Sequence, residues 1–417
     1  MAVLQLATVE MLADGAAPHG AVNAAVTLLR ADRRLAPYAA LANAVLRRVA
    51  EAGAADWAAA PPERLPKWLR GRLIAAWGSD AVAAMERAHE AGAPLDLTLR
   101  EGPEGEIPVP VAGEGAEEPG PEEPPGNAAA PGAQDPAGRA EPPRSSPQPP
   151  DPDAPARAGS EPPGDEGSPA MRGWAAALAA EPLPTGSLRR RAGGRVSDLP
   201  GYAGGAWWVQ DAAAALPVRG LALRPGESAL DLCAAPGGKT LQMAARGAAV
   251  TAVDISDRRL ARLRDNLART GLAAQLVAAD VLDWQPGRCF DAILLDAPCT
   301  ATGTIRRHPD LPFLRRREDV ASLAALQAAM LDRALGWLAP GGRLVFCTCS
   351  ILPEEGEAQV TAALARHPGL AVDAAAFALP GVEPGWRSPE GGLRIRPDHW
   401  AERGGIDGFY MAALRFG

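Results

Sequence analysis

Apolar residues recur every three or four positions through the first part of the chain. The segments AVNAAVTLLRADRR (21–34) and PYAALANAVLRRVAEAG (37–53) show this spacing most clearly, and the second ends at Gly53. Such a period places the apolar side chains on one face of a helix, and glycine is a frequent helix end. We therefore predict an all-α domain over residues 1–93.

The pattern changes after Glu227, where short apolar runs alternate with helical segments. The strand-like runs are SALDLCAA, AAVTAVDIS, AQLVAAD, DAILLDAP and RLVFCTCS; helices are expected over 256–271 and near 317–338. Continuous apolar strands divided by helices indicate a parallel sheet covered on both faces. The tail, GGLRIRPDHW followed by DGFYMAALRF, predicts a closing antiparallel pair. The predicted fold class is α/β, with ligands at the carboxyl ends of the strands.

A segment of different composition separates these two parts. Residues 101–170 hold 15 acidic and 3 basic residues, with 19 prolines, 11 glycines and almost no large apolar side chains. Such a segment cannot bury enough apolar surface to offset the entropy of ordering. We therefore predict a disordered acidic insert over 103–170. Residues 94–102 and 171–205 would form a small linking subdomain, and 206–417 the α/β domain.

The net charge of the chain conceals a difference between its parts. The whole chain carries −8, whereas residues 101–170 alone carry −12, so the rest is mildly basic at +4. Basic clusters occur at LRRRAGGR (188–195), IRRHPD (305–310) and LRRRED (314–319). Clusters of this kind either grip phosphates or form a solvated face, and the sequence favours neither.

Several classes of protein are disfavoured. No apolar run approaches the roughly 18 residues that span a bilayer. The start, MAVLQLATVE, lacks the basic and apolar regions of a secretion signal. The cysteine count is odd, which suits a reducing cytoplasm better than a disulfide framework. The five are Cys233, Cys289, Cys299, Cys347 and Cys349. We expect a cytoplasmic protein without a membrane segment.

Four predicted strands end in aspartate, and the first leads into the glycine turn of DLCAAPGGKT. These residues are Asp231, Asp254, Asp280 and Asp296. A strand-end carboxylate can accept hydrogen bonds from both hydroxyls of a ribose, so the set indicates a nucleoside-containing cofactor rather than four helix caps. A phosphate-binding loop would need glycine where Cys233 stands. S-adenosylmethionine, which has ribose, adenine and an amino-acid end but no phosphate, fits these constraints.

Two cysteines, Cys299 and Cys349, follow the last two predicted parallel strands and would face one cleft. A zinc site lacks the remaining ligands at suitable spacing, and a disulfide does not suit the compartment. Buried, inert thiols remain an alternative, and we expect that state for Cys289 and Cys347. The sharper hypothesis is a thiolate nucleophile beside a methyl donor, with no metal.

The motifs DAPCTATGTIRRHPD, TCS and DLCAAPGGKT resemble those of RNA 5-methylcytosine methyltransferases of the Nol1/Nop2/Sun family. The continuation GTIRRHPD favours the bacterial branch that acts on small-subunit (16S) ribosomal RNA. The resemblance is strong over 174–417 and implies a Rossmann-like S-adenosylmethionine-dependent domain. It is weaker over 1–100, where PHGAVNAAVTLLR and LANAVLRRV resemble the second half of a NusB-like RNA-binding domain.

The resemblance implies roles for individual residues. Cys349 would add to carbon 6 of cytosine, and Cys299 would assist removal of the carbon-5 proton and release of the enzyme. Asp296 would bond the ring nitrogen 3 and the amino edge of the base, and Lys239 would lower a thiol pKa or orient a carboxylate. The segment expected at the methionine end of the cofactor comprises Cys233, Ala234, Ala235, Pro236, Gly237, Gly238 and Lys239. For the rest of the cofactor the resemblance implies Asp254 at the ribose, Asp280 beside the adenine and Asp296 bordering both ligands.

Two departures and three alternatives stay open. The family's helical domain begins well before the position equivalent to Met1, so the domain here is N-terminally truncated or the native start lies upstream. The acidic insert falls where relatives have a small RNA-contacting subdomain. A transfer-RNA cytosine-5 methyltransferase shares the catalytic set, and a non-catalytic RNA-binding ribosome assembly factor would share the fold. A DNA cytosine methyltransferase would use Pro298-Cys299. No obligate protein partner is evident.

Overall fold

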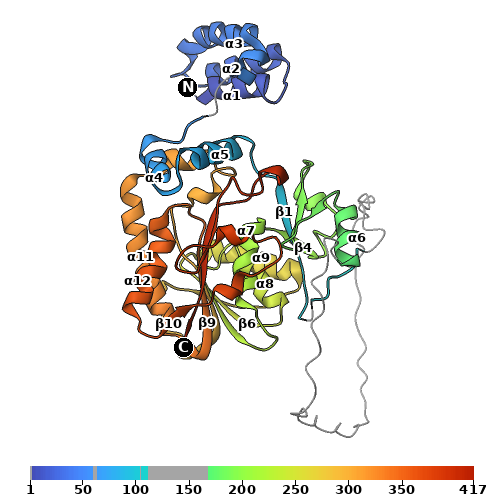
Figure 1. Ribbon diagram of the computed structural model, residues 1–417. Helices are drawn as coiled ribbons and strands as arrows, with labels where there is room; N and C mark the ends of the chain where they lie inside the picture. Colours follow the sequence, from blue (N-terminus) through green and yellow to red (C-terminus); the bar gives the residue numbers. More distant parts are fainter. Residues whose placement is uncertain (1, 60–62, 104, 111–167) are drawn as a thin grey trace, which may run out of the picture. The chain divides into compact units, whose positions relative to one another are not determined.

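The structure, a computed structural model, describes residues 2–59, 63–103, 105–110 and 168–417 (Figure 1). The chain divides into two compact units, Met1–Leu65 and Pro66–Gly417. The predicted acidic insert lies almost wholly outside the described residues. Within the described ranges, no helix is long and apolar enough to cross a bilayer.

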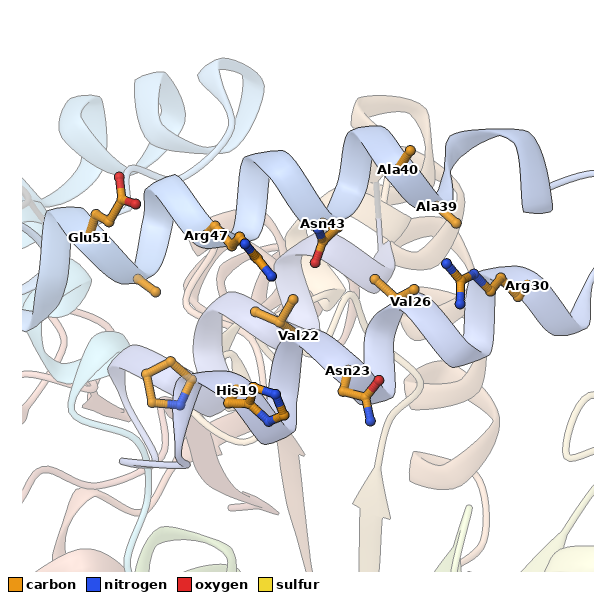
Figure 2. Close-up of a pocket in the computed structure, with 12 residues that line it drawn as sticks. His19, Val22, Asn23, Val26, Arg30, Ala39, Ala40, Asn43, Arg47 and Glu51 are labelled. Atoms are coloured by element: carbon orange, nitrogen blue, oxygen red, sulfur yellow. The ribbon is translucent and has the colours of Figure 1, made fainter.

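The first unit is helical, as predicted. Its elements are α1 (Ala2–Leu12), α2 (Pro18–Ala31), a 3-10 turn (Ala36–Tyr38) and α3 (Ala39–Ala59). Their apolar faces meet in one cluster that includes Met11, Leu29 and Leu46. Gly53 has φ 79° and interrupts α3 at the predicted helix end. A pocket of about 570 Å³ lies between α2 and α3, with Asn43 and Arg47 on its α3 side (Figure 2).

Two further helices, α4 (Lys67–Trp77) and α5 (Ser79–Glu90), belong to the second unit rather than the first. The indole Nε1 of Trp77 donates to the carbonyl oxygen of Ile351 at 3.0 Å, and Arg72 pairs with Glu354 at 2.6 Å. The sequence pattern grouped these helices with residues 1–93, whereas the structure divides the chain at 65/66. Helical periodicity does not reveal which neighbour a helix packs against, so it could not place this boundary.

A small antiparallel sheet joins the two segments that flank the insert. Its order is β2-β3-β1-β4, and the strands are β1 (Leu95–Leu99), β2 (Glu181–Pro182), β3 (Leu188–Arg190) and β4 (Trp207–Val209). The helix α6 (Pro169–Ala177) covers it, and Trp174 packs in one cluster with Leu97 and Trp207. The linking subdomain therefore has a core of its own.

The large sheet has the order β10-β12-β9-β8-β5-β6-β7, with β11 on β12. The strands are β5 (Ser228–Leu232), β6 (Ala249–Asp254), β7 (Gln275–Ala278), β8 (Phe290–Asp296), β9 (Leu338–Thr348), β10 (Leu370–Val372), β11 (Leu393–Ile395) and β12 (Phe409–Phe416). Strands β5 to β9 pair in parallel, and β12 pairs antiparallel with its neighbours. The predicted parallel sheet and its closing antiparallel pair are confirmed.

Successive side chains of a strand point to opposite faces of the sheet. Both faces of this sheet carry apolar side chains, and helices cover both. In β8, Leu294 packs in the cluster that contains α7 (Ala212–Leu221). Its neighbours Ile293 and Leu295 pack in the opposite cluster with α11 (Arg317–Leu335) and α12 (Glu357–Arg366). The remaining helices are α8 (Gly238–Ala245), α9 (Asp257–Thr270) and the short α10 (Leu311–Leu314). Ser256 caps α9 by accepting from the backbone N–H of Arg259 at 3.3 Å.

Candidate active site

All predicted site residues except Asp280 gather at the carboxyl edge of four adjacent strands. β5 lies between β6 and β8, and β9 follows on the far side of β8. Asp231 lies within β5, while Asp254 and Asp296 end β6 and β8. Parallel pairing brings these ends to one side of the sheet, which is where such sheets bind ligands.

A tight turn connects β5 to α8. Cys233 has φ 62°, the Ala235–Pro236 peptide is cis and Gly237 has φ 111°. A Cβ atom at Gly237 would lie 2.2 Å from Cδ1 of Leu263, so both the backbone angle and the space require glycine there. The glycine turn that the sequence predicts is therefore present, and it leads directly into α8.

Asp254 is nearly inaccessible and fixes this turn. It accepts hydrogen bonds from the backbone N–H of Ala235 at 3.2 Å and of Ser256 at 3.0 Å. The guanidinium of Arg259 lies 3.3 Å from the same carboxylate. Asp254 therefore joins the turn after β5 to the loop after β6.

Asp280 stands apart from the other predicted residues. It is exposed, and it accepts from the backbone N–H of Leu282 at 2.9 Å. Within the described chain, no hydrogen bond or ion pair joins it to the rest of the predicted set. Its role beside an adenine stays a prediction.

Lys239 and Asp296 form an ion pair at the centre of the edge. Nζ of Lys239 lies 2.8 Å from Oδ2 of Asp296, and the Cys347 thiol lies 3.5 Å from Oδ1. Burial alone would lower the pKa of Lys239, but the Asp296 carboxylate outweighs it and holds that pKa above its usual range. The ion pair is compatible with the carboxylate-orienting role expected of Lys239, and that role stays a prediction.

The sulfur atoms of Cys299 and Cys349 lie 3.4 Å apart. A disulfide would bring them to about 2 Å, so these are two thiols in contact, contributed by the loops after β8 and β9. The contact with Cys349, together with burial, raises the pKa of the Cys299 thiol well above its usual range. Cys299 is buried and Cys349 half-buried, so the more accessible sulfur is the one expected to attack a substrate.

The two cysteines expected to be buried and inert differ from one another. Cys347 is buried, and burial raises the pKa of its thiol. Cys289 is exposed, so the prediction was wrong for this residue. Cys289 precedes β8 at the opposite end from the site, where the chain enters the sheet, and an apolar run does not show where burial begins.

Two buried carboxylates at this edge were absent from the predicted site. Oδ1 of Asp231 is buried without a hydrogen-bond partner in the described structure, and Oδ2 accepts from the Thr240 hydroxyl at 2.5 Å. Burial, with a contribution from Asp296, raises the pKa of Asp231 to about 7. The second is Glu355, which contacts Thr300 beside Cys299. Asp231 was visible as a strand-end aspartate, whereas the sequence does not distinguish Glu355 from its acidic neighbours.

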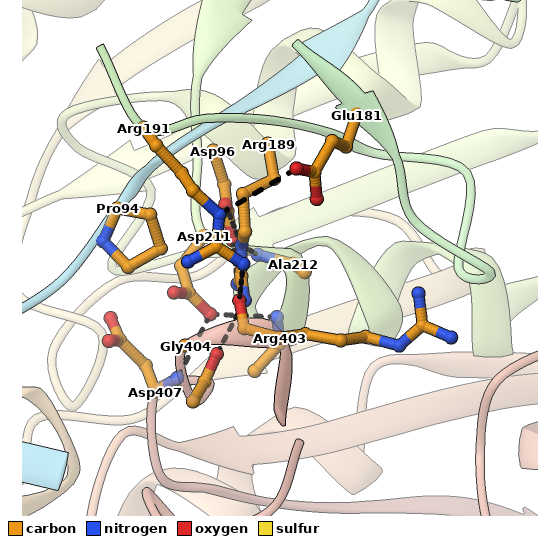
Figure 3. Close-up of polar contacts among 12 residues, drawn as sticks. Pro94, Asp96, Glu181, Arg189, Arg191, Asp211, Ala212, Arg403, Gly404 and Asp407 are labelled. Atoms are coloured by element: carbon orange, nitrogen blue, oxygen red, sulfur yellow. Dashed lines mark hydrogen bonds and ion pairs between the residues drawn. The ribbon is translucent and has the colours of Figure 1, made fainter. Parts of the chain in front are cut away.

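Two of the basic clusters contribute arginines to buried ion pairs, whereas the third (314–319) is largely exposed, as in a solvated face. Arg306 and Arg307 both pair with Asp211 and Asp407, at 2.6 to 2.9 Å. Arg189 is fully buried and forms a two-pronged pair with Asp96 at 2.7 Å (Figure 3). These arginines therefore neither grip phosphate nor form a solvated face. They fasten the small sheet and the segment after Cys299 to the large sheet.

The residues at the edge fit a nucleoside cofactor that lacks phosphate. Carboxylates at the ends of β6 and β8 supply acceptors for hydroxyl and ammonium groups, and the only lysine of the turn is already paired with Asp296. In the described part of the chain, no group of three or more histidine, cysteine or acidic side chains is placed to hold a metal ion.

Comparison with known proteins agrees with this geometry. Residues 218–415 match the family described as 16S rRNA methyltransferase RsmB/F. The chain is 47% identical over 224 residues to "Ribosomal RNA small subunit methyltransferase B" of Vibrio cholerae, covering 52% of this chain and 48% of that protein. The protein of the same name from Salmonella arizonae is 52% identical over 182 residues, 42% of each chain.

A solved structure shares the fold. The methyltransferase homolog protein from Pyrococcus horikoshii superposes with a TM-score of 0.57 at 21% identity, covering 85% of this chain and 100% of that one. This chain spans about half the length of the curated relatives it matches. Residues 218–415, which include the paired thiols at the carboxyl edge of the sheet, are similar to the 16S rRNA methyltransferase RsmB/F family.

Proposed function

We propose that this chain transfers a methyl group from S-adenosyl-L-methionine to carbon 5 of a cytosine in 16S ribosomal RNA, through a covalent cysteine–base intermediate. The observation that carries the proposal is the 3.4 Å contact between the sulfur atoms of Cys299 and Cys349, at the edge of the sheet where β8 ends in Asp296. The names of the relatives support the substrate class. The first unit, proposed as the remnant of a NusB-like domain, would bind the RNA, and the reaction would take place in the cytoplasm.

The two thiols divide the chemistry. Carbon 5 of cytosine is a poor nucleophile, so the Cys349 thiolate adds to carbon 6 and the electron pair moves toward carbon 5. Bound S-adenosylmethionine supplies an electrophilic methyl group to that carbon. Cys299 assists the loss of the carbon-5 proton to solvent, and as that proton leaves, the sulfur–carbon 6 bond breaks to return the Cys349 thiolate. Asp296 would accept from the amino edge of the base, held in orientation by Lys239.

The cofactor would lie against the turn from Cys233 to Lys239. The backbone of that turn would receive the methionine end, with Asp254 at the ribose, Asp280 near the adenine and Asp296 between cofactor and base. The target cytosine must leave any base stack to enter such a pocket.

Replacing Cys299 tests the covalent route. The variant Cys299→Ala should still form the bond between Cys349 and carbon 6 but release the product slowly. Protein and RNA should then migrate together on a denaturing gel. Free protein combined with rapid turnover would contradict the release role of Cys299.

The substrate class needs its own measurement. Bisulfite sequencing of ribosomal and transfer RNA from cells lacking this protein should show one missing 5-methylcytosine in 16S ribosomal RNA. Loss in a transfer RNA would favour that substrate, and an unchanged map would favour a non-catalytic assembly role. Methylation of duplex DNA by the purified protein would point to a DNA enzyme.

A further inference from the structure

The side chain of Glu355 is fully buried, and it contacts Thr300, the residue that follows Cys299. Its oxygens accept three hydrogen bonds: from the backbone N–H of Thr300 at 2.9 Å, the Thr300 hydroxyl at 2.5 Å and the Gln327 amide at 3.1 Å. All three donors are uncharged. Buried carboxylates usually face an arginine or lysine, so this arrangement calls for a functional explanation.

These bonds hold Cys299 from both sides. Thr300 follows Cys299 in the chain, and Glu355 fixes both its backbone and its side chain. The amide of Gln327, on α11, also donates to the carbonyl oxygen of Pro298 at 2.8 Å. The loop that carries Cys299 is therefore tied to a helix and to Glu355 on each side of the sulfur.

The same residue also holds the Cys349 loop. The carbonyl oxygen of Glu355 accepts from the hydroxyl of Thr348 at 2.8 Å. Glu355 itself lies only six positions after Cys349, in the 3-10 turn Pro353–Glu355. Between the loops, the N–H of Gly303 donates to the carbonyl oxygen of Cys349 at 2.9 Å. Two loops separated by 50 positions thus meet at one residue, the Cys299 loop at its carboxylate and the Cys349 loop at its backbone carbonyl.

We infer that Glu355 is a positioning residue, which clamps the Cys299 and Cys349 loops together so that their sulfur atoms meet across the base. This inference rests on the proposed function, because a fixed distance between two thiols matters when they act in turn on the same ring. Misplacing a reacting group by about 1 Å can lower a rate on the order of 100-fold. The charge of Glu355 has a second consequence, since it contributes to the raised pKa of Cys299.

Three variants separate this role from general stability. Glu355→Ala removes the clamp, and Glu355→Gln keeps its shape and one oxygen but loses the charge. Glu354→Gln is the matched control, because Glu354 is adjacent in the chain but half-exposed and paired with Arg72. Calorimetric binding of S-adenosylhomocysteine shows whether each variant retains its fold.

The first measurement needs no RNA. Diamide takes one hydrogen from each thiol as a disulfide forms, so the rate of Cys299–Cys349 cross-linking, followed by mass spectrometry of the full chain, reports their proximity. We expect rapid cross-linking in the wild type and Glu354→Gln, slower cross-linking in Glu355→Gln and the slowest in Glu355→Ala. Equal rates in all four proteins would overturn the clamp.

The second measurement is steady-state methylation of unmodified 16S ribosomal RNA transcribed in vitro. We expect kcat to fall on the order of 100-fold in Glu355→Ala and about tenfold in Glu355→Gln, with KM within about threefold. A rise in KM with unchanged kcat would overturn the clamp. If the wild type methylates no RNA, the proposed function fails, and the cross-linking rates alone decide the clamp. If Glu355→Ala does not fold, Glu355→Gln decides both measurements.

Discussion

The segment from Cys299 to Arg307 is anchored at each end by buried carboxylates, but by different chemistry. At the Cys299 end, Glu355 accepts only from uncharged donors. At the other end, Asp211 and Asp407 each pair with both Arg306 and Arg307, and Arg306 is fully buried. One segment therefore joins a carboxylate that forms no ion pair within the described residues to a cluster of two carboxylates and two arginines.

The difference teaches how a buried charge is used. Burial alone would raise the pKa of Asp211, but Arg307 and Arg306 lower it to about 2, so this carboxylate is ionised and neutralised. Such a cluster contributes to stability only while it is complete, because removing one member leaves a buried charge without a partner. An uncompensated carboxylate beside a thiol instead shifts the chemistry of that thiol. Substitutions at the arginine end of the segment should thus lower the free energy of unfolding, whereas substitutions at the cysteine end should lower the rate of methylation.

The largest effect should come from Cys349→Ala. Without the nucleophile, methylation of 16S ribosomal RNA should fall below detection, at least about 1,000-fold. The free energy of unfolding should change little, because the side chain is half-buried and small. A radioactive methyl-transfer assay, with urea unfolding in parallel, checks both. Full activity would show that Cys349 is not the nucleophile. Global unfolding of the variant would show that the cysteine end of the segment also determines stability.

Asp211→Ala should have the opposite profile. It leaves the buried Arg306 with one carboxylate instead of two and removes the cap of α7, where Asp211 accepts from the N–H of Ala213 at 2.8 Å. We expect a loss of about 3–5 kcal/mol in the free energy of unfolding. The control Asp332→Ala breaks the exposed pair with Arg366 and should cost about 0–1 kcal/mol. Equal urea midpoints for the two variants would contradict the stabilising role of the buried Asp211 cluster.

The sequence predicted the meeting of the thiols for a physical reason. The sequence predicts β8 and β9 as parallel strands of one sheet, and residues that follow the ends of such strands lie at the same edge of the sheet. This rule placed Cys299 and Cys349 together, and it also placed Asp254 and Asp296 near the turn. It depends only on periodicity and strand direction, which local sequence encodes.

Partners distant in the chain could not be predicted in this way. Arg306 finds Asp211 95 positions away, and nothing in IRRHPD distinguishes a buried pair from a phosphate contact. Glu354 and Glu355 are identical neighbours in the sequence, yet one is half-exposed and the other buried. Which of them faces the interior depends on the geometry of the turn after β9, which is set by tertiary packing.

Asp231 is a third kind of buried carboxylate, with neither an arginine nor a full set of donors. Its pKa is raised from 3.8 to about 7, mainly by burial. The folded state therefore keeps a proton that the unfolded state releases, and stability falls as the pH rises from about 4 to about 7. Asp231→Asn cannot titrate, so it should be more stable than the wild type at pH 8, by up to about 4 kcal/mol. At pH 4 the two proteins should differ little.

Urea unfolding of both proteins across this pH range measures the difference directly. Other titrating groups, such as Asp407, are present in both chains and largely cancel in the comparison. A constant difference from pH 4 to pH 8 would mean that Asp231 is ionised in the folded protein. Asp231 would then be an ionised carboxylate like Asp211, and there would be no third kind of buried carboxylate in this domain.

Asp254 lies between these classes and gives the smallest expected effect. It accepts from two backbone N–H groups and also faces Arg259, whose side chain is half-exposed. Removing it should loosen the turn from Cys233 and take away the proposed ribose acceptor, so S-adenosylhomocysteine should bind about tenfold more weakly to Asp254→Ala in calorimetry. The control Asp257→Ala changes an exposed carboxylate in the first turn of α9 and should leave the affinity unchanged. If both variants bind like the wild type, the ribose lies elsewhere and Asp254 acts only on the turn, as Asp211 acts only on its helix and arginines.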